Sequence, residues 1–163
     1  MKPELFIRRI EDSDRVWARK ILRDNWESDK IVTRGVIHET DRLPGYIALL
    51  DSLYAGLLIY DVKDGMLEII SLNVLEQRRG IGSALIQSAI QEARSLKCLR
   101  IWVITTNDNI PAIEFYQANG FKIAAIHEDA LIESRKLKPE IPHIGIDGAP
   151  IKDEIELEKK LEA

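Results

Sequence analysis

The spacing of hydrophobic residues changes along this chain, and each spacing predicts a different element. Residues 4–10 alternate between apolar and polar side chains, which predicts a first strand. Asp12 or Ser13 can then cap a helix that has one apolar and one charged side and runs to about Asn25. The polar residues 26–45, which are interrupted by glycine and proline, predict a mostly irregular crossing segment.

In the middle of the chain the hydrophobic period is two. The runs 46–50, 53–60 and 66–74 are rich in aliphatic, β-branched and aromatic residues. The last two runs are separated by a short polar stretch that ends in Asp64-Gly65, a sequence typical of hairpin turns. These three runs therefore predict an antiparallel meander.

The second half of the chain alternates between helical and strand patterns. The predicted elements are a helix over 80–96, a buried central strand over 99–105, a helix from Asn109 to Gly120, a strand over 121–127, a short helical stretch after it and a last strand over 153–161. We expect this last strand to leave an edge that could pair with a second copy and give a homodimer.

Composition places the chain among soluble globular proteins and predicts a single domain over residues 1–163. Its 23 Lys and Arg face 27 Asp and Glu, and 45% of its residues are hydrophobic. No block of basic residues exceeds two, which argues against nucleic-acid and membrane partners. A lone Cys98, histidines without metal-ligand spacing and an N-terminus without an apolar leader indicate a cytoplasmic protein with no metal.

The junction between the strand at 66–74 and the following helix is the first chemical signal. A helix N-terminus presents unpaired N–H groups to an anion, and Gly80 and Gly82 let that anion approach the backbone. Arg78 and Arg79 add positive charge, so a diphosphate fits this junction. The residues after Gly82 match neither an ATP-type phosphate loop, which needs a lysine there, nor a dinucleotide fingerprint, which needs glycine in place of Leu85. Alone, this Gly-x-Gly pair is equally consistent with a structural turn.

Two motifs together resemble the GNAT superfamily of N-acetyltransferases. The first is the signature Q/R-x-x-G-x-G/A, which is met here by QRRGIG at 77–82. The second block has the family pattern with Asn109, Phe115, Tyr116 and Gly120-Phe121 at its fixed positions. The resemblance covers about 4–127, and the polar closing segment is similar to an uncharacterised bacterial and archaeal subgroup.

This resemblance implies a mixed α/β fold in which a central, mostly antiparallel, twisted sheet of about seven strands is flanked by helices. Its neighbouring parallel strands, 67–74 and 99–105, would splay apart and hold acetyl-CoA as cosubstrate. By the same resemblance, the cofactor contacts are Leu72, Asn73, Val74, Arg79, Gly80, Ile81, Gly82, Ser83, Ala84 and Asn109. Residues 128–163 would be an elaboration of a core that spans about 4–127.

The family position of Tyr116 lies beside the cofactor sulfur, which implies that this residue is the general acid; from the residues alone it is a core aromatic. By the same resemblance Glu68 is the candidate general base, because some family members carry a catalytic glutamate at this place. Strand alternation puts it on the face of Ile70, Leu72 and Val74, from which it could project into the site. A strand-end glutamate paired with a lysine or arginine is an equal alternative. Another base position of the family is occupied here by Ile104.

The implied reaction is direct transfer of an acetyl group from acetyl-CoA to a primary amine of a small molecule or peptide. A non-catalytic module that binds or senses acyl-CoA is the alternative. Trp26, Arg34 and Tyr46 are candidates for the roof of the acceptor side, and the polar residues 105–108 are candidates for acceptor contacts or a simple turn. Asn109 can serve equally as a helix cap.

Overall fold

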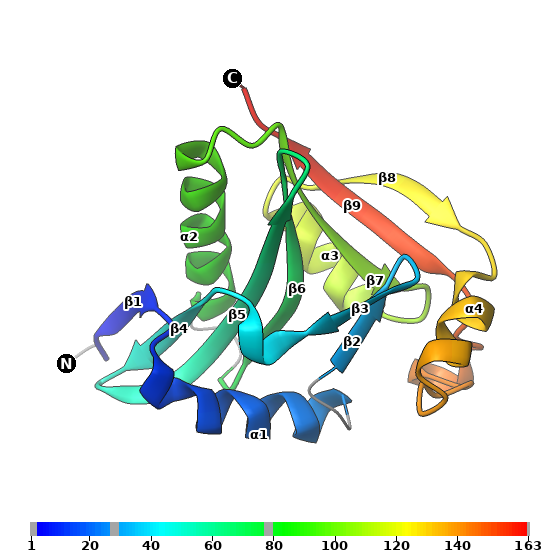
Figure 1. Cartoon of the computed structure of the whole chain (residues 1–163), viewed down its shortest axis with the longest axis horizontal. Helices are drawn as coiled ribbons and strands as arrows, with labels where there is room; N and C mark the ends of the chain where they lie inside the picture. The colour runs from blue at the N-terminus through cyan, green and yellow to red at the C-terminus, as the bar shows by residue number, and fades with distance from the viewer. Residues whose placement is uncertain (1–2, 27–29, 77–79, 163) are drawn as a thin grey trace.

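The computed structural model describes residues 3–26, 30–76 and 80–162, which form a seven-stranded sheet, a separate hairpin and flanking helices (Figure 1). In spatial order the sheet consists of β1 (Leu5–Arg9), β4 (Gly45–Leu50), β5 (Leu53–Lys63), β6 (Met66–Val74), β7 (Arg100–Thr106), β9 (Glu154–Lys160) and β8 (Lys122–His127). The hairpin consists of β2 (Lys30–Thr33) and β3 (Val36–Glu39). The helices are α1 (Arg15–Trp26), α2 (Ile81–Ser95), α3 (Ile110–Ala118) and α4 (Ala130–Leu137).

The expected fold class and its splayed parallel pair are confirmed. Strands β6 and β7 are parallel, and every other neighbouring pair in the sheet is antiparallel. Their pairing runs only from Met66–Arg100 to Ile69–Val103, although β6 continues to Val74. Beyond Ile69, therefore, β7 does not cover the backbone edge of β6.

The core has two layers, one on each face of the sheet. Helix α2 buries its predicted apolar side, including Leu85 and Ala89, against β4, β5 and β6. Helix α1 belongs to the other layer, where Ala18 and Leu22 pack with Ile47 and residues of β5. The start of α1 differs from the prediction, because a 3-10 turn capped at Glu11 precedes it and neither Asp12 nor Ser13 is the cap.

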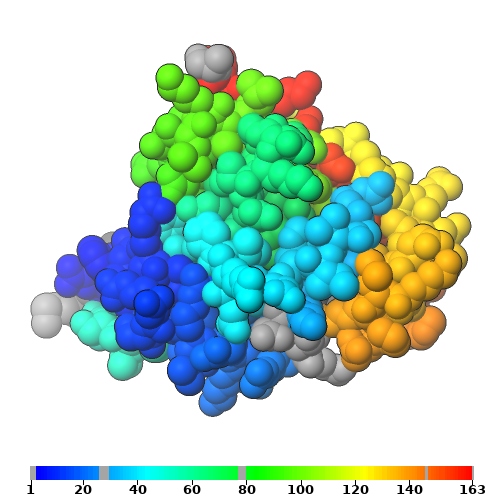
Figure 2. All heavy atoms as spheres, in the orientation of Figure 1, coloured from blue at the N-terminus to red at the C-terminus, as the bar shows by residue number. Residues whose placement is uncertain are grey.

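The β2–β3 hairpin corrects the expectation that residues 26–45 are mostly irregular. Its two-residue turn consists of Arg34 and Gly35, which both have positive φ (48° and 73°), as a tight hairpin turn requires. The backbone N–H and guanidinium of Arg34 donate to the buried carboxylate of Glu154, at 3.2 and 3.1 Å. The hairpin therefore lies over the sheet and is tied to β9, and Figure 2 shows its surface between β5–β6 and α4.

Strand β9 corrects the expectation of a free C-terminal edge. It pairs with β7 on one side and β8 on the other, so β8 is the edge strand at this end of the sheet. Leu157 of β9 is fully buried in the main core. Because residues 154–160 lie inside the central sheet, the segment after residue 127 supplies part of the core of the fold. Both edges of β9 are paired, so a dimer through an edge of β9 is ruled out.

We expect Leu157→Ala to lower the free energy of unfolding by about 2–5 kcal/mol, because it leaves a cavity in the core. Ile126→Ala in the edge strand β8 is the control, since Ile126 is 57% exposed. The control should cost about 0.5 kcal/mol or less. Urea unfolding of both proteins measures the difference, and equal losses would contradict the central position of β9.

Candidate functional site

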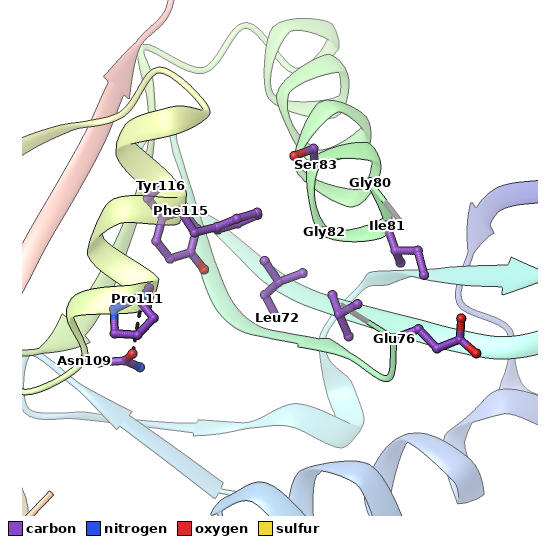
Figure 3. Close-up of a pocket in the computed structure, with 12 residues that line it drawn as sticks. Leu72, Glu76, Gly80, Ile81, Gly82, Ser83, Asn109, Pro111, Phe115 and Tyr116 are labelled. Carbon is purple, nitrogen blue, oxygen red and sulfur yellow. Dashed lines mark hydrogen bonds between the residues drawn. The ribbon is translucent and has the colours of Figure 1, made fainter. Parts of the chain in front are cut away.

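A cavity of about 440 Å³ lies between the start of α2, the inner side of α3 and the end of β6 (Figure 3). It opens where β6 and β7 part, so the splay of the parallel pair gives it room. Its lining residues are Leu72, Val74, Glu76, Gly80, Ile81, Gly82, Ser83, Asn109, Pro111, Ala112, Phe115 and Tyr116.

The N-terminus of α2 forms one wall of this cavity. Gly80 is the N-cap and has a positive φ of 70°. The amide of Ala84 already donates to the carbonyl of Gly80 at 3.0 Å, so this predicted cofactor contact is engaged within the helix. The amides of Ile81, Gly82 and Ser83 precede the first helical bond and face the cavity end of the helix, where the helix dipole favours an anion.

The close neighbours of Gly82 leave little room for a side chain. A Cβ atom there would lie 3.0 Å from Cζ of Phe115 and 3.5 Å from a methyl group of Val74. By contrast, nothing lies within 4 Å of a Cβ built on Gly80, whose backbone conformation is the reason for glycine. Helix α2 and the Phe115 ring thus approach closely because residue 82 has no side chain.

The end of β6 forms a second wall. Leu72 and Val74 point into the cavity, as Figure 3 shows for Leu72. Asn73 does not line it, since its side-chain amide donates to the Ser71 hydroxyl at 2.7 Å. Because the pairing with β7 ends at Ile69, the backbone of residues 70–74 faces this opening.

Tyr116 comes from α3 and is 6% exposed, and its ring packs edge-on against Phe115 and tilted against Phe121. It nevertheless lines the cavity, and within the described residues its hydroxyl has no hydrogen-bond partner. Burial raises the pKa of the Tyr116 phenol above its ordinary value. A phenol is protonated at neutral pH even at its ordinary pKa near 10, so Tyr116 carries a proton there.

Asn109 is the N-cap of α3, and its side chain accepts a hydrogen bond from the Ala112 amide at 3.2 Å. The predicted capping role is thus confirmed, and Asn109 also lines the cavity. The next predicted contact, Arg79, lies outside the described residues, as do Gln77 and Arg78.

Residues 105–108 form the end of β7 and the turn after it, and the C-terminal segment holds them. The Asn107 side chain donates to the Pro150 carbonyl and accepts from the amides of Lys152 and Asp153. These bonds fasten the loop, so the turn interpretation applies to Asn107.

Glu68 does not share a face with Leu72 and Val74, contrary to the prediction. Opposite β5, the register shifts within β6, where Ile59 pairs with Ser71 and Tyr60 with Ile69. One extra residue reverses the alternation of a strand. Glu68 therefore points to the face that carries the hairpin, and Tyr116 lies on the other face.

A second cavity, of about 220 Å³, lies on the hairpin side of the sheet. Its lining residues are Thr33, Arg34, Val36, His38, Asp61, Lys63, Asp64, Met66, Glu68 and Trp102. Glu68 is in register with Trp102, one pair before the last pair of β6 and β7, so this cavity lies beside the paired part of the two strands on the hairpin face.

Of the candidates for an acceptor roof, Arg34 lines the second cavity. Tyr46 does not, because its hydroxyl reaches Glu92 of α2 at 3.4 Å on the other side of the sheet. The side chain of Trp26 lies outside the described residues.

Glu68 is 8% exposed and is held by the hairpin. The Thr33 hydroxyl lies 2.7 Å from its Oε2 and 2.6 Å from Nε2 of His38. Burial raises the pKa of Glu68 to about 7, the Thr33 hydrogen bond opposes this rise, and the charges of Asp61, Glu154 and Glu156 add to it. A carboxyl with a pKa near neutrality can accept and release a proton at working pH.

Thr33 and His38 are the residues of this site that the sequence pattern did not reveal. Their signal was the pair of short β-branched runs around Arg34-Gly35, which is a hairpin pattern and places the two residues on neighbouring strands. Neither interpretation of Glu68 anticipated these two partners. The alternative, pairing with a lysine or arginine, is wrong for the described part of the chain, where no such side chain pairs with Glu68.

The described ranges contain neither a metal-binding cluster nor a membrane-spanning helix. No group of three His, Cys, Asp or Glu side chains is arranged to hold a metal ion there. Among the helices that the structure describes, none is long and apolar enough to cross a membrane.

Comparison with known proteins agrees with the geometry. The acetyltransferase (GNAT) family matches residues 6–121. Two uncharacterised Bacillus subtilis proteins are similar in sequence. YdhI is 37% identical over 89% of this chain and 94% of the YdhI chain. YxbD is 38% identical over 86% of this chain and 89% of the YxbD chain.

Two solved structures share the fold. One is a Bacillus subtilis acetyltransferase in complex with CoA, with a TM-score of 0.68, 22% identity and coverage of 99% of this chain and 100% of that one. The other is an Elizabethkingia anophelis GNAT acetyltransferase with acetyl-CoA bound, with a TM-score of 0.67, 21% identity and coverage of 96% and 98%.

Proposed function

Because the chain belongs to the acetyltransferase (GNAT) family, whose members use acetyl-CoA, we propose that it transfers an acetyl group directly to a primary amine. The observation that carries this proposal is a cavity where β6 and β7 separate, together with a second cavity on the opposite face of the sheet. One cavity has the features of a cofactor site, and the other presents a buried carboxyl to an acceptor. The acceptor is a small-molecule or peptide amine, and the proposed location is the cytoplasm.

The residues of the first cavity fit acetyl-CoA. The amides of Ile81, Gly82 and Ser83 would bind the pyrophosphate, and the absence of a side chain at Gly82 leaves room beside Phe115. The open backbone edge of β6 near Leu72 would bind the extended arm of the cofactor, and a backbone N–H there would polarise its carbonyl. Acetyl-CoA supplies an activated acetyl thioester and a thiolate leaving group.

The two titratable residues divide the proton transfers. An amine must be neutral to attack, although its ordinary pKa lies near 10. Glu68 would remove its proton from the hairpin side, directly or through a water molecule. Tyr116, whose phenol has an ordinary pKa near 10 and is therefore protonated at neutral pH, would donate to the leaving thiolate.

Two measurements separate this function from a non-catalytic acyl-CoA-binding module. Thiol release from acetyl-CoA is followed with a panel of polyamines, amino sugars and peptides with free amines, and calorimetry measures CoA binding. We expect binding together with thiol release that depends on one class of amine. Tight binding without turnover of any acceptor would favour the non-catalytic module, and failure to bind CoA would overturn both.

We expect Gly82→Ala to weaken CoA binding roughly tenfold, because the new methyl group lies 3.0 Å from the Phe115 ring and narrows the cavity. Helix propensity itself favours alanine, so the helix should not lose stability. Calorimetry with CoA is the measurement. Gln87→Ala, at an exposed position of the same helix, is the control; equal affinities of the two variants would argue against this cofactor position.

A further inference from the structure

A continuous hydrogen-bond chain runs from the candidate base into the hairpin. It consists of Glu68 in β6, Thr33 in β2 and His38 in β3, whose exposed fractions are 8%, 6% and 7%. The Thr33 oxygen bridges the other two at 2.7 and 2.6 Å, whereas the His38 nitrogen is 3.8 Å from the nearer Glu68 oxygen. The hydroxyl is therefore the link between the carboxyl and the imidazole.

The direction of these hydrogen bonds depends on the proton of Glu68. When Glu68 is ionised it can only accept, so Thr33 donates to it and the Nε2–H of His38 donates to Thr33. When Glu68 is protonated and donates to Thr33, the hydroxyl turns toward His38, whose Nε2 must then accept and whose Nδ1 carries the hydrogen. Both arrangements satisfy all three groups without moving a heavy atom.

We propose that Thr33 and His38 are the positioning residues that carry the acceptor's proton away from Glu68; this inference rests on the proposed function. The amine protonates Glu68, and His38 exchanges its Nε2 hydrogen for one at Nδ1 through solvent. Glu68 then passes its proton to the Thr33 oxygen, and Thr33 releases its own proton to the free Nε2 of His38. The imidazole then loses its Nδ1 proton to solvent. Glu68, Thr33 and His38 each gain one hydrogen and give up one, so Glu68 returns to the ionised state.

The surroundings favour a neutral imidazole that releases the proton it receives. Burial lowers the pKa of His38, which Lys63 lowers further and Asp61 opposes. Around Glu68, Asp61 of β5 and both Glu154 and Glu156 of β9 disfavour its charge, while the Arg34 guanidinium in the same cavity is paired with Glu154.

A purely structural role, in which Thr33 and His38 only fasten the hairpin, makes different predictions. Thr33→Val removes the hydroxyl with little change of shape. Because the Thr33 hydrogen bond lowers the pKa of Glu68, its loss should move the acidic limb of kcat/KM upward by about 0.5–1 pH unit. Thr33→Ser should restore the limb. A purely structural role predicts the same movement of the limb in Thr33→Val, but a wild-type plateau of kcat in both variants.

His38→Gln tests proton transfer separately from hydrogen bonding, because its amide can donate to Thr33 but cannot shuttle a proton. We expect kcat to fall at least tenfold, with CoA affinity and the thermal unfolding midpoint close to wild type. Wild-type kcat in this variant, or an unmoved pH limb in Thr33→Val, would overturn the relay.

The histidine tautomer gives a readout independent of turnover. In ¹⁵N NMR, His38 should shift from the Nδ1–H to the Nε2–H form as pH rises through the titration of Glu68, and Glu68→Gln should abolish the shift. One tautomer at all pH values would overturn the relay while leaving acetyl transfer intact. Failure of the proposed function has a different signature, since then no amine supports thiol release by wild type.

Discussion

Glu68→Gln is expected to lower kcat by about 10²–10⁴-fold, the usual contribution of a general base, with unchanged affinity for CoA. The substitution keeps the size of the side chain and an oxygen that can accept from Thr33, but it removes the group that takes the amine's proton. Initial rates at saturating substrates and calorimetry with CoA measure the two effects.

The pH dependence has a defined sign. Base catalysis needs the ionised carboxylate, and burial raises the pKa of Glu68 to about 7. Wild-type kcat/KM should therefore rise with pH up to about 7 and level off above it, and this acidic limb should vanish in Glu68→Gln. Glu133→Gln, at an exposed position in α4, is the control. A variant that keeps wild-type kcat and the same limb would remove Glu68 from the mechanism.

The same group links activity to stability. Because the folded pKa of about 7 lies above the ordinary 4.5, the folded chain retains a proton that the unfolded chain releases between these values. That stabilisation is complete below the unfolded pKa and is lost as pH rises through the folded one. Above pH 7, Glu68→Gln should therefore be more stable than wild type, by up to about 3 kcal/mol. Thermal unfolding at pH 5 and pH 8 measures this.

Tyr116→Phe is expected to lower kcat by about 10²-fold or more, because no proton is delivered to the leaving thiolate. Its stability should change little, since the ring contacts with Phe115 and Phe121 remain and the lost hydroxyl has no partner among the described residues. Thiol release at saturating acetyl-CoA and amine is the measurement.

Tyr60→Phe is the matched control for this substitution. Tyr60 is also buried, and its hydroxyl donates to Glu92 at 3.0 Å, away from both cavities. The control should lose about 1–3 kcal/mol of stability, because Glu92 loses a donor, and keep its kcat. If the two variants show the same kcat, Tyr116 is a core aromatic and not the general acid.

Regular periodicity made most of this fold predictable. The meander, α2 and the strands around α3 follow directly from apolar spacing, since each element buries one side or both. Strands β2 and β3 were missed because four-residue runs within a polar stretch give little periodic signal. The place of β9 was also missed, since its partners β7 and β8 are set by non-local pairing and its own alternation is the same in the middle or at the edge of a sheet.

The face of Glu68 illustrates a second limit. The extra residue at the register shift is Ile70. Ile69 is buried against α2 and Ile70 in the α1 layer, as regular alternation would also place them, so these two isoleucines give no sign of the shift. An alternating pattern extrapolated across them assigns the wrong side to every later residue. The two motifs located the cofactor side of the site, whereas the acceptor side needed the three-dimensional structure.

The bond between Arg34 and Glu154 has a consequence for the order of folding. Glu154 belongs to β9, which is synthesised after the other strands of the sheet and must enter between β7 and β8. The hairpin obtains this anchor only after synthesis reaches β9, whereas all the lining residues of the first cavity have been made much earlier. During synthesis the cofactor wall can form first, and the second cavity is completed only after β9 has been made.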